Sequence, residues 1–489
     1  VDEFNIRPES RNRIFDNLRD YLHDRADPAD RVMLVRAAGQ ARIEQGFTND
    51  VGLLDAALER MESRTGRAME LDVEYRLLMR QLRNASLYEP GQGGGGGAFT
   101  VENPNSFAAA INEAERLAQQ IAILAERRYQ RVVATVETLE QFIHTLAGMR
   151  GRKAVLYVSD GMPVRTAESL VEAWIGKYAS WMTTSGQQGL SRQMVALNSL
   201  DFDASSELRR LVAEAAANRV AFYPISNPGG RGGAGLSAEI GGSGTMAGGG
   251  PGSRDVATIE RFNREEALLQ MADGTGGVAY TRSRNVGGLL DLVRQDFHSF
   301  YSLGYLQPPD EEAGRHRIEV EVARDDLEVR YLKSYQERDP VEHLRDLARS
   351  ALHYDLVSNP LEVRLSPGEP KSLGGRRFLV PVMVMVPFDR LLLVPQDGKH
   401  VGRLILTVVA LDQDGGQSTP REILVPVEIP NDRVLEAASG AAGYPMELEM
   451  RSGDHKISVG VRDELAKVDA TVSLELRVGP SPKESVHRP

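Results

Sequence analysis

The sequence predicts an α/β protein in which a mostly parallel sheet carries a long helical-hairpin insertion and is followed by an all-β domain. Three observations predict this class. Strand-like apolar segments alternate with helical patterns up to about residue 298, as in a parallel sheet with helical crossovers. Residues 111–146 repeat apolar side chains at steps of three and four. From about residue 299, strand patterns dominate.

The composition is that of a globular protein and excludes several functional classes. The chain has 489 residues, of which 41% are hydrophobic and 26% charged, and its formal net charge is −11. This acidic balance argues against nucleic-acid binding, which favours a basic face. The chain has no cysteine, which excludes disulfides, cysteine-bound zinc and thiol catalysis. It also lacks an apolar run of about 18 residues, so we expect no transmembrane segment.

The first 60 residues predict a strand, a helix, two strands and a second helix. The helical parts are recognised by apolar spacing and by a capping residue, Asn49 or Asp50, before an apolar periodic run. The predicted elements are a strand at 1–6, a helix around 14–22, strands at 31–37 and 42–47, and a helix from about 50.

Residues 63–150 predict a helical hairpin inserted into the sheet domain. Its second arm has a seam of apolar side chains, formed by Ile111, Ala114, Ala118, Ile121, Ala125, Tyr129, Val132, Val136, Leu139, Ile143 and Leu146. An intramolecular partner is offered by Leu71, Tyr75, Leu78 and Leu82. The alternative is that the seam packs on a partner helix or a second copy. Gly-rich tracts at 91–97 and 229–252 are predicted as loops.

The rest of the first domain alternates strands and helices and ends near residue 336. The predicted elements are strands at 153–159, 220–225 and 276–280, helices at 208–217, 259–271 and 286–297, and antiparallel edge strands at 299–306, 316–323 and 327–335.

The last part of the chain predicts a separate all-β domain. A linker at 337–360 contains a helical segment at 341–353, an immunoglobulin-like sandwich spans 361–480, and 481–489 form a tail. The predicted strands lie at 377–386, 404–411, 423–429, 446–450, 457–461 and 470–478. Edge strands of such a sandwich could accept a strand from a partner.

An ordered set of motifs resembles the von Willebrand factor A (VWA) type domain, specifically the bacterial VWFA-related proteins first grouped from Acidobacteria. The resemblance covers residues 1–336. The matching segments are Val1-Asp2-Glu3-Phe4-Asn5, Asp30-Arg31-Val32, Phe47-Thr48-Asn49-Asp50, Gly151 to Gly161, Ala221 to Ile225, Thr275-Gly276-Gly277 and Tyr301 to Tyr305. The resemblance implies a doubly wound, mostly parallel, Rossmann-like sheet whose first strand is central.

The same resemblance implies a metal-ion-dependent adhesion site, which is degenerate in this chain. The family pattern is Asp-x-Ser-x-Ser, a distant Thr and an Asp before Gly. Asp2, Thr48 and Asp160 match its acidic and threonine positions, whereas Phe4 and Ile6 replace both serines. We expect either a relic that binds no metal or a weak, water-rich Mg²⁺ or Ca²⁺ site.

Partner contact is predicted around the same strand ends, and no catalytic or organic-cofactor site is predicted. The partner-binding candidates are Asn5, Asp160 and Gly161. The spacing Gly230-x-Gly232-x-x-Gly235 matches the dinucleotide fingerprint, but no helix follows directly to hold a pyrophosphate.

These features together predict a non-enzymatic protein-binding or scaffold protein of the bacterial cell envelope or exterior. Family members usually carry export signals, and the chain begins at Val1 rather than Met, so we expect a processed or truncated chain that is periplasmic or extracellular. The first alternative is a structural subunit of a surface assembly that self-associates through the helical insertion and the sandwich. The second is a metal-assisted hydrolase using Asp2 and Asp160.

Overall fold

The computed structural model divides into two compact units. The first comprises Val1–Gln141 and Arg152–Gln336, and the second comprises Phe142–Gly151 and Glu337–Pro489. The structure describes residues 1–25, 27, 29–64, 69–85, 104–149, 151–184, 188–198, 202–227, 253–281, 286–301, 303, 315–324, 326–327, 329–336, 339–354, 358–437 and 439–479. The predicted Gly-rich loops at 91–97 and 229–252 and the tail at 481–489 lie outside these residues.

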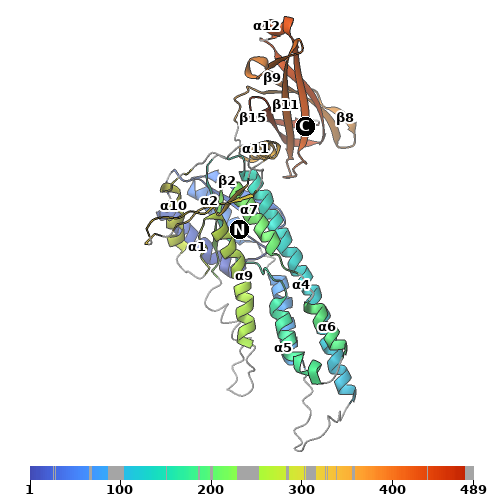
Figure 1. The fold of residues 1–489 in the computed structure, drawn as a ribbon. Helices are drawn as coiled ribbons and strands as arrows, with labels where there is room; N and C mark the ends of the chain where they lie inside the picture. The colour runs from blue at the N-terminus through green and yellow to red at the C-terminus, as the bar shows by residue number, and fades with distance from the viewer. Residues whose placement is uncertain are drawn as a thin grey trace, which may run out of the picture. The chain divides into compact units, whose positions relative to one another are not determined.

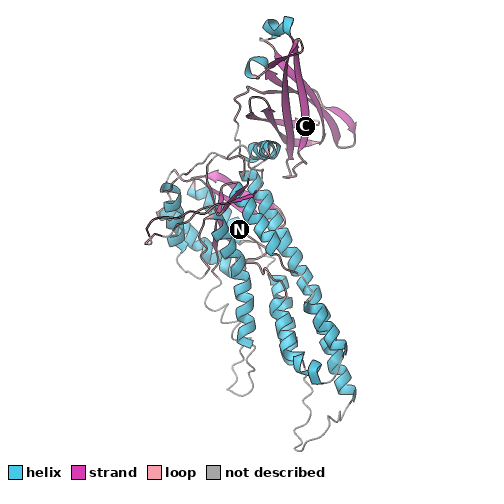
Figure 2. Cartoon of the chain, in the orientation of Figure 1, coloured by secondary structure: helices cyan, strands magenta, loops and turns pink. Residues whose placement is uncertain are grey.

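The first unit combines long helices with short strands (Figures 1 and 2). Its helices are α1 (Pro8–Asp24), α2 (Val51–Glu62), α3 (Met69–Asn84), α4 (Pro104–Leu146), α5 (Glu168–Thr184), α6 (Gln188–Asn198), α7 (Ser205–Ala217), α9 (Ser253–Thr275) and α10 (Val286–His298). Its strands are β1 (Val32–Ala37), β2 (Ala41–Thr48), β3 (Lys153–Val158), β4 (Val220–Ile225), β5 (Arg315–Arg317) and β6 (Ser334–Gln336). The end of α4 belongs to the second unit.

Regular parallel pairing in the described part of the chain is confined to β3 and β4. β1 pairs with β2, and β5 with β6, in antiparallel fashion. Isolated bridges join these small sheets. Asp2 bridges to Ala37 of β1 and donates its N–H to the carbonyl of Val158 in β3 at 3.0 Å, and Tyr280 bridges to Ile225 of β4. The unit is therefore mixed α/β, and these short sheets do not show the predicted doubly wound parallel sheet.

Several predicted strands of this unit are shorter than expected. The predicted strand at 1–6 is reduced to a bridge at Asp2, because the Asp2 side chain accepts hydrogen bonds from the N–H groups of Phe4 and Asn5 and the backbone turns there. The strand predicted at 276–280 is a single bridge at Tyr280. Among the described residues, the segments predicted as strands at 316–323 and 327–335 pair through β5 and β6 and through a hydrogen bond from the Ile318 N–H to the Lys333 carbonyl, and those of 299–306 form no strand.

Apolar residues hold helices against the strands of the first unit. Ile14 of α1 and Leu289 of α10 are fully buried and share a cluster with Val158 of β3 and Tyr223 of β4. α7 and α9 also contact β4. At the start of α2, the Asp50 carboxylate accepts hydrogen bonds from the N–H groups of Gly52 and Leu53, which confirms the predicted helix cap.

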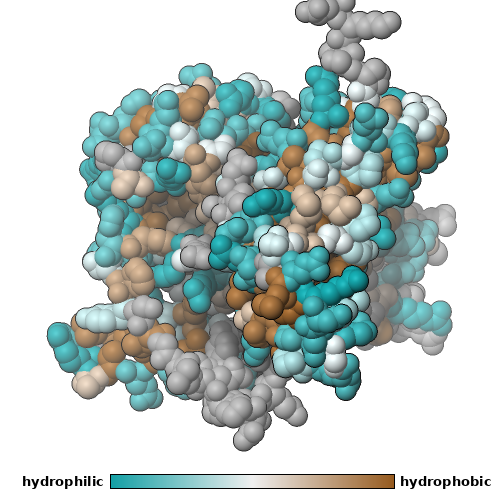
Figure 3. Space-filling view, turned by 90° about the horizontal axis from the view of Figure 1, so that it is seen from above, coloured by the Kyte–Doolittle hydropathy of each residue, from teal (hydrophilic) through white to brown (hydrophobic). Residues whose placement is uncertain are grey.

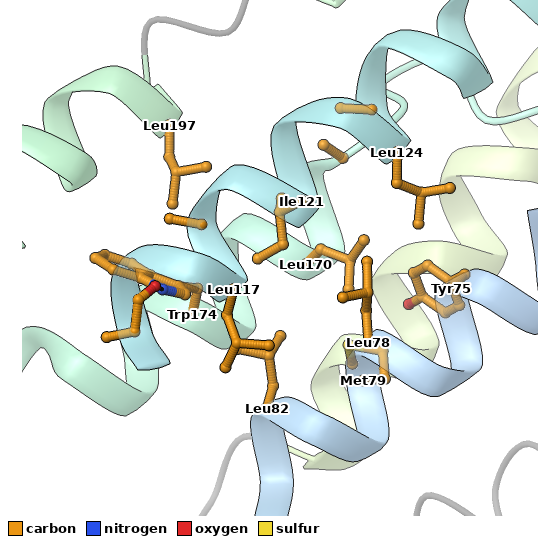
Figure 4. Packing of buried hydrophobic residues seen from close by; sticks show 14 of the residues in the cluster. Tyr75, Leu78, Met79, Leu82, Leu117, Ile121, Leu124, Leu170, Trp174 and Leu197 are labelled. Carbon is orange, nitrogen blue, oxygen red and sulfur yellow. Dashed lines mark hydrogen bonds between the residues drawn. The ribbon is translucent and has the colours of Figure 1, made fainter. Parts of the chain in front are cut away.

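A helical arm is formed by α3, residues 104–141 of α4, α5 and α6. Its core (Figure 4) joins apolar side chains of all four helices, among them Leu71, Tyr75, Leu78, Leu82, Ala114, Leu117, Ala118, Ile121, Leu124, Leu170, Trp174 and Leu197. The predicted packing of the first half of the α4 seam against α3 is confirmed. The sequence did not predict α5 and α6, whose side chains cover the rest of this face.

The second unit contains two antiparallel sheets. Its strands are β7 (Arg364–Pro367), β8 (Lys371–Gly374), β9 (Arg377–Pro387), β10 (Val394–Gln396), β11 (Lys399–Asp412), β12 (Arg421–Pro430), β13 (Ala441–Arg451), β14 (Gly453–Asp463) and β15 (Val468–Val478). β7, β8, β9 and β13 form one sheet, and β10, β11, β12, β14 and β15 form the other. The short helices are α11 (Pro340–Tyr354), η1 (Phe388–Arg390), η2 (Asn431–Arg433) and α12 (Val434–Ala437).

One hydrophobic core serves both sheets of the second unit. Val380, Val382 and Val384 of β9 are buried, as their predicted alternation requires, and share a cluster with Leu406 of β11 and Val459 of β14. α11 packs on β11, β14 and β15. Among the described helices of the whole chain, none is both long enough and apolar enough to cross a membrane.

Candidate functional site

Asp2 is the centre of a buried hydrogen-bond network at the strand ends of the first unit. Its side chain is fully buried, and one oxygen, Oδ1, accepts from the backbone N–H groups of Phe4 (3.0 Å) and Asn5 (3.2 Å). The other oxygen accepts from Asn5 Nδ2 (2.8 Å), Ser159 Oγ (3.1 Å) and the Tyr157 hydroxyl. Burial raises the pKa of the Asp2 carboxyl, although the hydrogen bonds act in the opposite direction.

Asn5 connects Asp2 with Asp160, the residue that follows β3. The Asn5 side chain donates to Asp2, while its backbone carbonyl accepts from the Asp160 N–H at 2.8 Å. Asp160 Oδ2 accepts from the backbone N–H and from Nε of Arg7, both at 3.0 Å. The structure therefore brings Asp2, Asn5 and Asp160 together, and Arg7 neutralises the Asp160 carboxylate.

Thr48 does not join this network. It pairs with Val32 at the start of β1, whereas Asp2 bridges to Ala37 at the end of the same strand. These positions are about 16 Å apart along β1, at roughly 3.3 Å per residue. Thr48 Oγ1 instead accepts from the Asp50 N–H at 3.0 Å, beside the start of α2. Because β1 and β2 pair in antiparallel fashion, Thr48 lies at the end of β1 that is remote from Asp2.

Gly161 has a structural role in this site. Its φ of +84° lies in the left-handed region, and a Cβ atom there would lie 2.9 Å from the carbonyl carbon of Arg264 and even nearer to the oxygen. The lack of a side chain therefore lets α9 approach the loop that follows β3.

Replacing Gly161 with alanine is expected to lower the unfolding free energy of the first unit by about 2–4 kcal/mol, from backbone strain and displacement of α9. Gly39 is a matched control, because its φ is +80° but a Cβ atom there would meet only the Phe4 ring at 3.6 Å. Gly39→Ala should cost about 1–2 kcal/mol. Hydrogen exchange of residues 151–165 and of α9 measures the difference, and equal losses in both variants would contradict this role.

A small pocket lies beside Asp160 and is lined mainly by the first loop and α4, with residues from α3, the segment after β3 and α9. Its volume is about 20 Å³, and it is lined by Phe4, Asn5, Arg7, Leu71, Asp72, Arg128, Arg131, Val132, Asp160, Pro163 and Arg264. A space of this size holds about one water-sized group. The pocket therefore suits contact with a single small group.

Three of the four arginines around the pocket are held in ion pairs. Arg7 pairs with Asp160, Arg128 with Glu260, and Arg264 with Glu260 and, at 2.5 Å, with Asp72. Burial alone would raise the pKa of Glu260 and of Asp72, but the charges of Arg128 and Arg264 outweigh it and lower both pKa values. These residues form a charged network that joins α3, α4 and α9.

The residues at the strand ends do not fit the metal site that the family resemblance implies. A divalent cation needs free carboxylate or hydroxyl oxygens. Both Asp2 oxygens already accept hydrogen bonds, and Asp160 Oδ2 accepts two from Arg7. The guanidinium groups of Arg131 and Arg264 add positive charge to the pocket lining. Only Asp160 Oδ1 is left for a ligand.

The sequence is matched by no model of a known protein family and by no curated protein. The assignment to VWFA-related proteins therefore depends on the motifs given above and is taken up as a proposal below. The arginine-rich pocket lining was missed from the sequence. Its signal was the position of Arg128 between Ala125 and Val132, inside the apolar stripe of α4.

Proposed function

We propose that this chain is a non-enzymatic protein-binding or scaffold protein of the bacterial cell envelope or exterior, whose first unit is VWA-like. The order β2, β1, residues 1–3, β3, β4 and Tyr280, joined by pairings and single bridges, supports a wound arrangement of the first unit. In such folds ligands bind beyond the carboxyl ends of the strands. Asn5 and Asp160 lie at that place.

The observation that carries the binding role is the fixed geometry of the pocket wall. The Asp2 network holds residues 4 and 5 in place, and the Asn5 carbonyl holds Asp160. Because hydrogen bonds within the chain occupy the Asp2 and Asp160 carboxylates, these groups position a binding surface. They are poor metal ligands for the metal-assisted hydrolase considered above. A rigid pocket wall in which some polar atoms have no strong hydrogen bond favours recognition of a partner's side chain.

Site-specific crosslinking in the cells that produce the protein tests this proposal. We would place the photoreactive phenylalanine analogue p-benzoylphenylalanine at Phe4, an aromatic position in the pocket lining, and at Leu424, which is 60% exposed in the second unit. We expect a covalent adduct with another protein from position 4, weakened by Arg131→Gln in the same chain, and none of the same mass from position 424. No adduct from position 4 would refute the proposal.

The same experiment addresses self-association, the alternative function. Exposed apolar side chains on three arm helices favour it: Leu77 is 47% exposed, Ile123 60% and Val195 63%. The face drawn in Figure 3, seen from above, shows hydrophobic residues interspersed among hydrophilic ones and does not identify the arm residues. With the analogue at Ile123, an adduct between two copies of the chain, together with none from position 4, would replace the binding proposal with self-association.

A further inference from the structure

Arg131 on α4 is the pocket arginine that has no carboxylate within ion-pair distance among the described residues. Its guanidinium makes one long contact, from Nη1 to the Phe4 carbonyl at 3.5 Å. The other three arginines of the pocket lining are engaged with Asp160, Asp72 or Glu260. Arg131 therefore brings hydrogen-bond donors to the pocket that its own unit uses only weakly.

Asp160 supplies the complementary group, a carboxylate oxygen that accepts no hydrogen bond from the described residues. Its side chain is only 5% exposed, and Oδ2 accepts both hydrogen bonds from Arg7. Oδ1 is buried and accepts none from the described residues. A buried carboxylate oxygen without a donor is costly, and Asp160 lines the pocket, so a ligand there that turned this side chain toward a donor would be stabilised.

The unused donors of Arg131 and the unused acceptor of Asp160 need hydrogen-bond partners of opposite kinds in one small space. Arg131 needs an acceptor and Asp160 Oδ1 needs a donor, and both residues line the same pocket of about 20 Å³. A carboxylate would satisfy Arg131 but place a second negative oxygen against Oδ1. An ammonium or metal cation would satisfy Oδ1 but meet the Arg131 charge. A carboxamide carries one acceptor oxygen and two N–H donors on a single planar head.

We infer that the pocket binds a neutral carboxamide, the side chain of an asparagine or glutamine of the partner protein, with its oxygen on Arg131 and its NH₂ group on Asp160 Oδ1. This inference depends on the proposed binding function and specifies the partner group. The group is held by the chain's own donor and acceptor, without a metal.

Acetamide and acetate form a matched pair of probes, because they have the same number of non-hydrogen atoms and differ in the N–H donor and in the negative charge. Saturation-transfer NMR on the full chain detects binding through the methyl protons of each probe. Probes this small should bind with a Kd of roughly 1–50 mM. We expect saturable transfer to acetamide, at least about fivefold stronger than transfer to acetate.

Two variants test which atoms make the contact. Arg131→Gln should abolish the saturable acetamide signal. In Asp160→Asn, Arg7 holds the amide oxygen at the Oδ2 position, so an NH₂ group replaces the vacant acceptor. This variant should reverse the preference, so that acetate binds better than acetamide. Arg127→Gln, which changes an exposed arginine on the same helix, is the control and should leave both signals unchanged.

The outcomes separate this inference from the proposed function. No saturable acetamide signal, or an equal signal in Arg131→Gln, would mean that water alone fills the pocket and would overturn the inference. Stronger binding of acetate to the unaltered chain would overturn it in favour of an acidic partner group. In either case a crosslinked adduct from position 4 would still support the proposed protein binding. Circular dichroism confirms that each variant is folded before its signal is compared.

Discussion

Replacing Glu260 with alanine is expected to destabilise the first unit by about 3–5 kcal/mol, because it leaves Arg128 buried without a counter-charge. The Arg128 side chain is 2% exposed and that of Glu260 is 10% exposed. Glu260 also accepts hydrogen bonds from Arg264 Nε at 3.0 Å and from Ser169 Oγ at 2.9 Å. The Arg128 guanidinium additionally donates to the Thr166 carbonyl. One substitution therefore disturbs the packing of α4, α5 and α9 together.

The neighbouring pair Arg127–Glu74 is a matched control for this prediction. It joins α4 to α3, whereas Arg128–Glu260 joins α4 to α9, and its side chains are 45% and 37% exposed. Glu74→Ala should cost less than about 1 kcal/mol, because water screens such a pair. Hydrogen exchange of α3, α4 and α5 measures both effects, and exchange in Glu260→Ala should be about 150- to 5,000-fold faster. Similar protection in the two variants would show that the buried network does not stabilise the arm.

The acid sensitivity of the arm should depend on the same network. The pKa of Glu260 and of Asp72 is lowered in the folded chain, since the charges of Arg128 and Arg264 outweigh the effect of burial. A lowered native pKa gives stability that is complete above the unfolded value, about 4.3 for Glu, and is lost as the pH falls through the native value. Glu260→Gln should remove its part of this dependence, so the variant and the original chain should differ less at low pH than at pH 7.

The elements predicted correctly are those whose burial has a regular period. The α4 seam from Ala114 to Ala125 repeats apolar residues at helical spacing, and the alternation from Val380 to Val386 specifies one buried face of a strand. The helices α5 and α6 were missed, although Leu170, Trp174 and Tyr178 recur at steps of four. Predicted strands failed where side chains redirected the backbone, as Asp2 does at residues 4 and 5.

The candidate site was predictable only in its backbone positions. Asp160 follows β3, and the Asp2 N–H donates to the Val158 carbonyl of that strand, so the proximity of the two residues follows from this backbone contact. Thr48 was wrongly grouped with them, because β1 and β2 form a hairpin and not two parallel strands. Arg131 and Arg264 come from helices far apart in sequence, and no local pattern pairs them. Both guanidinium groups line one pocket because α4 and α9 lie beside the same loop, residues 4–7.

The second large effect is expected from Trp174→Ala in the arm core. Trp174 is fully buried, its ring centroid lies 5.2 Å from that of Tyr178, and its Nε1 donates to the Ala114 carbonyl of α4 at 3.0 Å. Removing the ring leaves a cavity between α4 and α5 (Figure 4) and loses the indole hydrogen bond to the Ala114 carbonyl. We expect the arm to lose about 3–5 kcal/mol of stability.

Two further substitutions separate the contributions of this side chain. Trp174→Phe keeps most of the ring and loses the hydrogen bond to Ala114, so it should cost about 1–3 kcal/mol. Ile123→Ala, on the exposed face of α4, should change stability by less than about 0.5 kcal/mol. Hydrogen exchange of α4 and α5 ranks the three variants. If Trp174→Ala exchanged no faster than Ile123→Ala, α5 would not be docked on α4 through this residue, and the seam of α4 would be free to pack on another chain.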